Sequence, residues 1–354
     1  MSPKIRGAAS RSFRDDDTDA FDRPRRTRPR TKDRPDFSKL PLGRVITVDR
    51  GRYHCALVND DDLLPVDPPV QVLAAKARNL GRKAAIVGDV VHLDGDVTGE
   101  AGTLARIVEV TERTTVLRRT ADDDDPFERP IVANADQLMI VTALADPPPR
   151  VGMIDRMLVA AFDAGIQPIL CLTKADLASP DALVAAYQPL DVPVVVTQPG
   201  SDLAQIRELL NDHVTVLVGH SGVGKSTLVN ALIPTAQRSV GVVNDVTGRG
   251  RQTSTSVIAL ELPSGADEQG GGWAIDTPGV RSFGLSHVTP DTILAAFADL
   301  AGFTEECPRG CRHTSTEPEC GLDAAAARGE LPLPRLESFR RMERAGREDP
   351  GRDR

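Results

Sequence analysis

The stretch VTVLVGHSGVGKST, residues 214–227, joins a short apolar run to a glycine-rich turn. Residues 214–218 have the β-branched composition of a buried strand, and residues 226–232 have the composition of a helix. A turn of the form G-x-x-x-x-G-K-[ST] between a strand and a helix is typical of a phosphate-binding loop, because its backbone N–H groups surround the β-phosphate of a nucleotide. The stretch therefore predicts an α/β domain with a parallel sheet and a nucleotide at the carboxyl ends of its strands.

Every position of this loop is a predicted nucleotide contact. The Lys225 ammonium would reach the β- and γ-phosphate oxygens, and the Ser226 hydroxyl would coordinate Mg²⁺. The predicted phosphate-binding residues are Gly219, His220, Ser221, Gly222, Val223, Gly224, Lys225, Ser226 and Thr227.

A second segment lies upstream of the loop and predicts which base is bound. Thr173, Lys174, Ala175 and Asp176 form the pattern N/T-K-x-D with which GTPases read guanine. The Asp176 carboxylate can accept from both the N1–H and the 2-amino group of guanine, which adenine does not offer. In an ordinary GTPase the phosphate loop precedes this segment, so the reversed order predicts a circularly permuted nucleotide domain.

A third segment, DTPG at residues 276–279, follows the apolar run 273–275. In this D-x-x-G element Asp276 would hold Mg²⁺ through a water molecule, and the Gly279 N–H would meet the γ-phosphate. The three segments together predict a site built for nucleotide turnover.

The composition limits the remaining classes. The 354-residue chain is 40% hydrophobic, which suits two or three globular domains, and its net charge of −8 argues against indiscriminate nucleic-acid binding. Aromatic residues make up 3%, which gives little support to a base-stacking platform. The sequence has no apolar run of the length that a membrane span requires, so we expect no membrane association.

The pattern along the chain predicts six regions. We expect a disordered charged tail over residues 1–38, an oligonucleotide-binding (OB) β-barrel over 39–118 and an acidic linker over 119–130. The permuted GTPase domain would span 131–290, a helical zinc-binding domain 291–345, and a disordered tail 346–354. The N-terminal tail is either a solubilising segment or an arm that touches RNA phosphates.

Basic residues in the predicted barrel could bind phosphates, although solvated loop charge is the alternative. They are Lys76, Arg78, Arg82, Lys83, Arg113, Arg118 and Arg119.

A cluster of metal-ligand residues lies in the predicted C-terminal domain. Cys307, Cys311, His313 and Cys320 give the spacing C-x₃-C-x-H-x₆-C. Three thiolates and one imidazole complete a tetrahedral set for Zn²⁺ with no open position, so the predicted zinc is structural.

These residues resemble the bacterial ribosome small subunit-dependent GTPase A family. The resemblance covers about residues 40–342 and is carried by residues 133–137, 219–227, 276–285 and the Cys307–Cys320 cluster. It implies a cytoplasmic GTPase, expected to be a monomer, that binds the small ribosomal subunit and its rRNA late in assembly. The subunit would stimulate turnover, and the protein would leave after hydrolysis.

The chain departs from the family pattern at three places. Thr173 stands where the family usually has Asn, and the first zinc spacing is three residues where the family often has four. Gln252 stands where the first switch of the family carries a His that is implicated in hydrolysis. We expect Gln252 to orient the attacking water, and Thr253 to share the coordination of Mg²⁺ with Ser226.

The resulting hypothesis is GTP hydrolysis by in-line attack of water, with Lys225, Gln252, Thr253 and Asp276 as the catalytic residues. One alternative is an RNA-binding assembly factor that uses the nucleotide only structurally. Another is an ATP-dependent enzyme of nucleic-acid metabolism, which Asp176 argues against.

Overall fold

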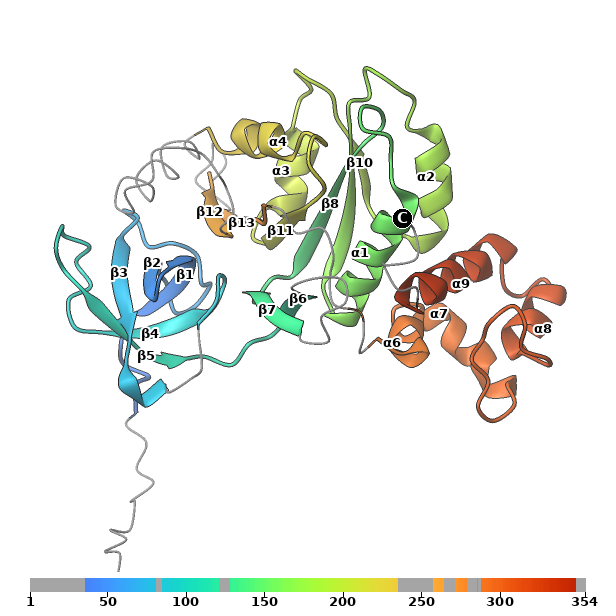
Figure 1. The fold of residues 1–354 in the computed structure, drawn as a ribbon, viewed down its shortest axis with the longest axis horizontal. Coiled ribbons are helices and arrows are strands. Elements are labelled where there is room, and N and C mark those ends of the chain that lie inside the picture. The colour runs from blue at the N-terminus through green and yellow to red at the C-terminus, as the bar shows by residue number, and fades with distance from the viewer. Residues whose placement is uncertain are drawn as a thin grey trace, which may run out of the picture. The chain divides into compact units, whose positions relative to one another are not determined.

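The computed structural model describes residues 36–80, 85–120, 128–234, 257–263, 271–278, 285 and 288–347, and all statements about structure concern these residues. The part of the chain described contains no helix with the length and apolarity of a membrane span. Figure 1 shows the arrangement of its strands and helices.

The first five strands close into a barrel, in the order β1-β2-β3-β5-β4. Residues that point inward along these strands, such as Val45, Cys55, Leu93 and Ile107, are completely buried, because alternate side chains of a strand face the same side. The barrel confirms the predicted OB-like domain. Its strands are β1 (Leu42–Asp49), β2 (Arg52–Val58), β3 (Gln71–Lys76), β4 (Val90–Asp94) and β5 (Ala105–Val110), with the 3₁₀ turn η1 (Arg78–Leu80) after β3.

A separate two-stranded antiparallel sheet follows the barrel. It consists of β6 (Val116–Thr120) and β7 (Glu128–Ala133). The acidic run at residues 122–125 lies outside the described residues, but the residues on both sides of it belong to these paired strands.

The strand that leads into the phosphate loop, β11 (Val214–Val218), lies inside a six-stranded sheet of order β10-β9-β8-β11-β13-β12. Neighbouring strands are parallel except for the β12–β13 pair, which is antiparallel. The other strands are β8 (Gln137–Ala143), β9 (Gln167–Thr173), β10 (Val194–Val196), β12 (Ile258–Leu262) and β13 (Gly272–Asp276).

Helices cover both faces of this sheet. Alternate residues of β8 separate the two cores: Leu138 and Ile140 pack in the cluster that includes Leu158, and Met139 and Val141 pack in the cluster that includes Leu228. A parallel sheet with both faces covered reads as a continuous apolar run, and every residue of β8 is buried. The helices of this domain are α1 (Val151–Asp163), α2 (Asp181–Tyr187) with the 3₁₀ turn η2 (Gln188–Leu190), α3 (Ala204–Leu210) and α4 (Lys225–Leu232).

The C-terminal part is helical and encloses the cysteine-rich loop. Residues 290–301 form two short helices rather than one, because the backbone breaks at Phe297, whose φ of −115° and ψ of 58° are not helical. The break turns this ring into the core, where it meets Phe339 at 5.4 Å and Phe162 at 6.2 Å between ring centres. The elements are α6 (Pro290–Ala295), α7 (Ala298–Ala301), the 3₁₀ turn η3 (Gly302–Glu306), α8 (Gly321–Ala327) and α9 (Leu333–Arg347).

The barrel touches the sheet at its β12–β13 edge. The Arg44 guanidinium of β1 lies 5.5 Å from the centre of the Trp273 ring in β13, and the Thr47 hydroxyl donates to the Val257 carbonyl. Burial lowers the pKa of Arg44 to about 10, and the negative charge of Asp136 opposes that shift.

Candidate functional site

The phosphate loop occupies the turn between β11 and α4, at the carboxyl end of the sheet. A Cβ at Gly219 would lie 2.4 Å from the Val141 carbonyl oxygen, so only glycine allows this approach of β8 and the loop. Gly224 has φ of +90°, a left-handed conformation that directs the chain into the first turn of α4. Ser226 is exposed at that helix N-terminus.

Two of the predicted catalytic side chains meet directly. The Lys225 ammonium forms an ion pair with the Asp276 carboxylate. The neighbouring strands β11 and β13 bring them together, because Leu217 pairs with Asp276 in the parallel register. The pair gives the buried Lys225 ammonium a compensating negative charge.

The segment predicted to read guanine lies beside the same loop. Thr173 ends β9, and its hydroxyl donates to the Val223 carbonyl over 2.6 Å. Lys174, with φ of 58°, turns away from the strand, and its ammonium donates to the Asp146 carbonyl. Asp176 is exposed two residues further on.

The structure therefore brings three of the predicted segments to one edge of the sheet: residues 173–176, residues 219–227 and Asp276. Gln252, Thr253 and Gly279 lie outside the described residues. In the loop, His220 Nδ1 lies 3.0 Å from the Ser221 carbonyl oxygen. Its Nε2 is buried and has no hydrogen-bond partner among the described residues.

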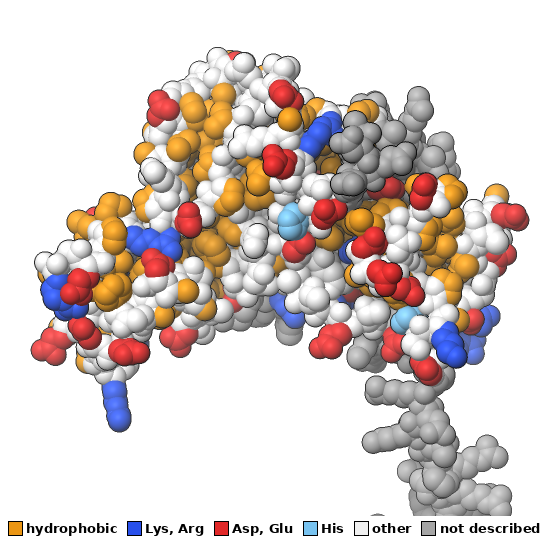
Figure 2. All heavy atoms as spheres, turned by 180° about the vertical axis from the view of Figure 1, so that it is seen from behind, with side chains coloured by type: hydrophobic (Ala, Val, Ile, Leu, Met, Phe, Trp, Pro, Cys, Tyr) orange, Lys and Arg blue, Asp and Glu red, His pale blue; other side chains and the backbone are white. Residues whose placement is uncertain are grey.

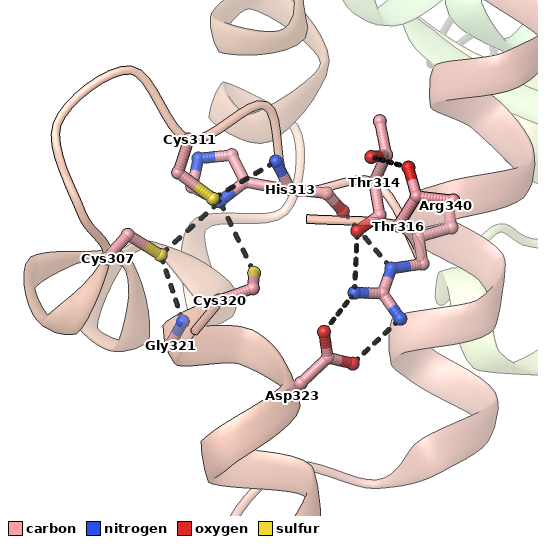
Figure 3. A network of polar contacts seen from close by, with 9 residues as sticks. All are labelled: Cys307, Cys311, His313, Thr314, Thr316, Cys320, Gly321, Asp323 and Arg340. Carbon is pink, nitrogen blue, oxygen red and sulfur yellow. Dashed lines mark hydrogen bonds and ion pairs between the residues drawn. The ribbon is translucent and has the colours of Figure 1, made fainter. Parts of the chain in front are cut away.

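The cysteine-rich loop brings four ligand atoms together (Figure 3). One atom each from Cys307, Cys311, His313 and Cys320 lies within 4.8 Å of the other three. His313 Nδ1 lies 3.5 Å from the sulfurs of Cys307 and Cys311 and 3.8 Å from that of Cys320. This three-thiolate, one-imidazole set fits a structural Zn²⁺, which would be held by all four side chains.

Backbone groups orient these ligands. The Gly321 N–H donates to Cys307 Sγ over 3.1 Å, and the His313 N–H donates to Cys311 Sγ over 3.4 Å. A Cβ on Gly321 would lie 2.3 Å from the Phe303 carbonyl oxygen, so the close approach depends on this glycine.

Arg340 of α9 fixes the same loop from outside the ligand set (Figure 3). Its guanidinium donates to both oxygens of Asp323, at 2.7 and 2.8 Å, and to the His313 carbonyl at 3.1 Å. Sequence reasoning missed this role, because nothing in the sequence distinguishes this arginine from the other basic residues of α9.

The adjacent Arg341 faces helices α1 and α2 of the sheet domain instead. Its Nε lies 3.2 Å from Asp155 Oδ2 in α1, and its Nη2 donates to the Ala186 carbonyl at 3.2 Å. Asp155 also accepts from the Tyr187 hydroxyl at 2.8 Å. Burial raises the pKa of Asp155, and the Arg341 charge is the largest of the opposing effects. Two consecutive arginines thus connect α9 to the metal loop and to α1 and α2.

The basic residues predicted for the barrel do not form one uniform group, and Arg118 and Arg119 lie in β6 of the two-stranded sheet that follows it. Arg113 forms a two-pronged ion pair with the completely buried Asp89, at 2.7 and 2.8 Å, so its role is structural rather than phosphate binding. Arg78, Arg118 and Arg119 are exposed, while Arg82 and Lys83 lie outside the described residues.

Comparisons with known proteins identify the family of this chain. The family model described as RsgA GTPase matches residues 110–286. The small ribosomal subunit biogenesis GTPase RsgA of Ectopseudomonas mendocina is 40% identical over 223 residues, which are 60% of this chain and 63% of that protein. The protein of the same name from Pseudomonas fluorescens is 39% identical over 243 residues, which are 66% of this chain and 68% of that protein. The chain thus spans 63% of the length of the first of these relatives.

Two solved structures share the fold. The structure of YloQ, described as a circularly permuted GTPase, aligns with a TM-score of 0.60 at 25% identity, over 89% of this chain and 97% of that one. The structure of YjeQ from Thermotoga maritima aligns with a TM-score of 0.59 at 24% identity, over 86% of this chain and 97% of that one. The predicted order, with the base-reading segment before the phosphate loop, therefore matches the circular permutation described for YloQ.

Proposed function

Because the chain belongs to the RsgA GTPase family, we propose that it binds GTP, hydrolyses it to GDP and phosphate, and acts in the late maturation of the small ribosomal subunit. The observation that carries this proposal is the meeting of the base-reading segment, the phosphate loop and Asp276 at one edge of the sheet. Binding to the subunit and its rRNA stimulates turnover. The protein works as a cytoplasmic monomer.

The groups at this edge, and Gly279 outside the described residues, each have a role in the proposed reaction. The loop from Gly219 to Thr227 surrounds the phosphates, Asp176 reads guanine, and the Gly279 N–H meets the γ-phosphate. Lys225 exchanges its partner Asp276 for phosphate oxygens when the nucleotide binds, since phosphate offers the ammonium a second anion. Ser226 and Thr253 would hold Mg²⁺ together with Asp276, and the ion would supply charge neutralisation at the phosphates.

Positioning matters more than proton removal in phosphoryl transfer, because its transition state is largely dissociative. Gln252 orients the attacking water through its amide carbonyl. The cysteine–histidine cluster would hold one structural Zn²⁺, which would take no part in the hydrolysis.

The test is phosphate release from GTP and from ATP by the full-length protein with purified small subunits, large subunits or buffer alone. We expect turnover of GTP, accelerated by the small subunit and abolished by Lys225→Ala. GTP binding without turnover under any of these conditions would instead favour an assembly factor that uses the nucleotide structurally. Equal turnover of ATP would contradict the assignment of Asp176.

A further inference from the structure

The Thr173 hydroxyl donates its one hydrogen bond to the phosphate loop. Its hydroxyl oxygen lies 2.6 Å from the Val223 carbonyl oxygen and 3.3 Å from the Thr142 carbonyl oxygen. Both neighbours are acceptors, so the single hydroxyl proton goes to one of them, and the shorter distance selects Val223. Thr173 is 5% exposed, which leaves little water to compete for that proton.

This bond joins two parts of the proposed nucleotide site. Val223 is buried and precedes Gly224, where the loop turns into α4. A Cβ at Gly224 would lie 3.6 Å from the Thr173 hydroxyl oxygen, so this side chain packs against the loop as well as bonding to it. On its other side, Thr173 continues directly into Lys174, which is tied to the Asp146 carbonyl. A displacement of Thr173 would therefore shift the phosphate loop and the base-reading segment together.

The single proton also limits what the side chain can offer a base. The edge of guanine that Asp176 does not read carries only acceptors, N7 and O6. An asparagine amide has two donor protons and can bond to a loop carbonyl and a ring nitrogen at once, whereas a threonine hydroxyl has one. We propose that Thr173 is a positioning residue that fastens the base-reading segment to the phosphate loop, and that this chain binds guanine without a side-chain hydrogen bond to N7. The inference rests on the proposed binding of guanine nucleotides.

The experiment compares GDP with 7-deaza-GDP, which lacks the N7 acceptor, by equilibrium competition on the full-length protein. We expect the unmodified protein to bind the two within about twofold of each other. Thr173→Asn supplies a second donor and should create a preference for GDP of about fivefold, the ratio that one net hydrogen bond provides.

Three further variants test the positioning role. Thr173→Val keeps the shape and removes the bond to Val223, so it should weaken both nucleotides by the same factor, at least about fivefold. Thr173→Ser keeps the hydroxyl and should restore most of that loss. Thr215→Val is the matched control, because the buried Thr215 hydroxyl donates over 2.8 Å to Gln137, which does not belong to the phosphate loop. Loss of this bond should leave the affinities for both nucleotides unchanged.

The outcomes separate the inference from the proposed function. A preference of the unmodified protein for GDP of fivefold or more would overturn the claim about N7. Unchanged affinities in Thr173→Val would overturn the positioning role. Failure of the unmodified protein to bind either nucleotide would overturn the proposed function and this inference with it.

Discussion

Among single residues, Asp176 has the sharpest expected effect. Its exposed carboxylate is an acceptor-only group, placed at the end of a segment whose other side chains are fixed by Val223 and Asp146. Asp176→Asn replaces an acceptor by a donor, which mismatches the 2-amino group of guanine and matches the 2-carbonyl of xanthine. We expect the preference for GTP over xanthosine triphosphate to fall on the order of a hundredfold, as for two charge-assisted hydrogen bonds, in a competition assay.

The nearby Asp181→Asn is the control, because Asp181 is also exposed but belongs to the first turn of α2. An Asp176→Asn protein with unaltered GTP affinity would refute the assignment.

Gly321 is the second residue with a specific expectation. The purified protein should contain about one equivalent of zinc, as for one tetrahedral site. In Gly321→Ala the new Cβ would collide with the Phe303 carbonyl and displace the N–H that bonds to Cys307. We expect about tenfold weaker zinc retention against a chelator, and a C-terminal domain less stable by about 2 kcal/mol.

Gly302→Ala is the matched substitution, since a Cβ at Gly302 would meet no atom within 4 Å. Equal zinc retention by the two variants would show that the close approach at Gly321 does not hold the loop.

At the scale of elements, α9 connects to α1 through a buried charge. Arg341→Met leaves the buried Asp155 carboxylate with the Tyr187 hydroxyl and the weaker effect of the Arg344 charge, so the pKa of Asp155, already raised by burial, rises further. When the pKa of a carboxyl group is higher in the folded than in the unfolded protein, the free energy of unfolding falls as the pH rises through the folded-state pKa. The loss of unfolding free energy caused by Arg341→Met therefore begins above the Asp155 pKa of the unmodified protein. It is complete above the higher Asp155 pKa of the variant. At neutral pH we expect up to about 3 kcal/mol.

Urea unfolding of both proteins between about pH 5 and 8 measures this penalty. The double variant Asp155→Asn/Arg341→Met removes the titrating group, so its difference from Asp155→Asn should not vary over that range. A penalty for Arg341→Met that is the same at every pH would contradict the buried-charge explanation.

The elements also show which parts of the structure can be predicted from the sequence. The barrel strands, the phosphate-loop strand and the metal cluster depend on local patterns: alternation, a glycine-rich turn and ligand spacing. The break at Phe297 and the roles of Arg113, Arg340 and Arg341 depend on partners far away in the sequence. Arg341, for example, bonds to a carbonyl 155 residues earlier. No local pattern records such a pairing, so it emerges only from packing.

For the whole molecule, the distribution of exposed basic residues determines where the proposed RNA contacts can lie. The net charge is −8, and Figure 2 shows acidic side chains scattered over one face with Lys and Arg in small groups between them. Exposed Arg78, Arg118 and Arg119 offer local positive charge, whereas Arg113 is occupied by Asp89. Replacing these three exposed arginines by Glu should weaken the proposed binding to the small subunit and flatten its salt dependence, because fewer counterions are released.

Subunit binding at several salt concentrations measures this effect, with GDP affinity in the same variant as the internal control. Deleting the whole barrel is less informative, since it would also uncover the Trp273 ring that packs against Arg44. An unchanged salt dependence would place the RNA contacts on other residues.

The reversed order of the two nucleotide segments has a consequence for how the chain emerges during synthesis. The strand β8 is buried along its whole length, with β9 on one side and β11 on the other, and Gln137 at its start bonds to a residue 78 positions later. As the polypeptide grows from its N-terminus, β8, β9 and β10 exist before β11 does, so one edge of an apolar strand stays open until then. Such an open edge is a target for nascent-chain chaperones. In an unpermuted domain the phosphate loop is synthesised first, so a bound nucleotide can stabilise the growing domain early. In this chain three of the six strands of the sheet, β8, β9 and β10, are synthesised before the phosphate loop that would bind the nucleotide.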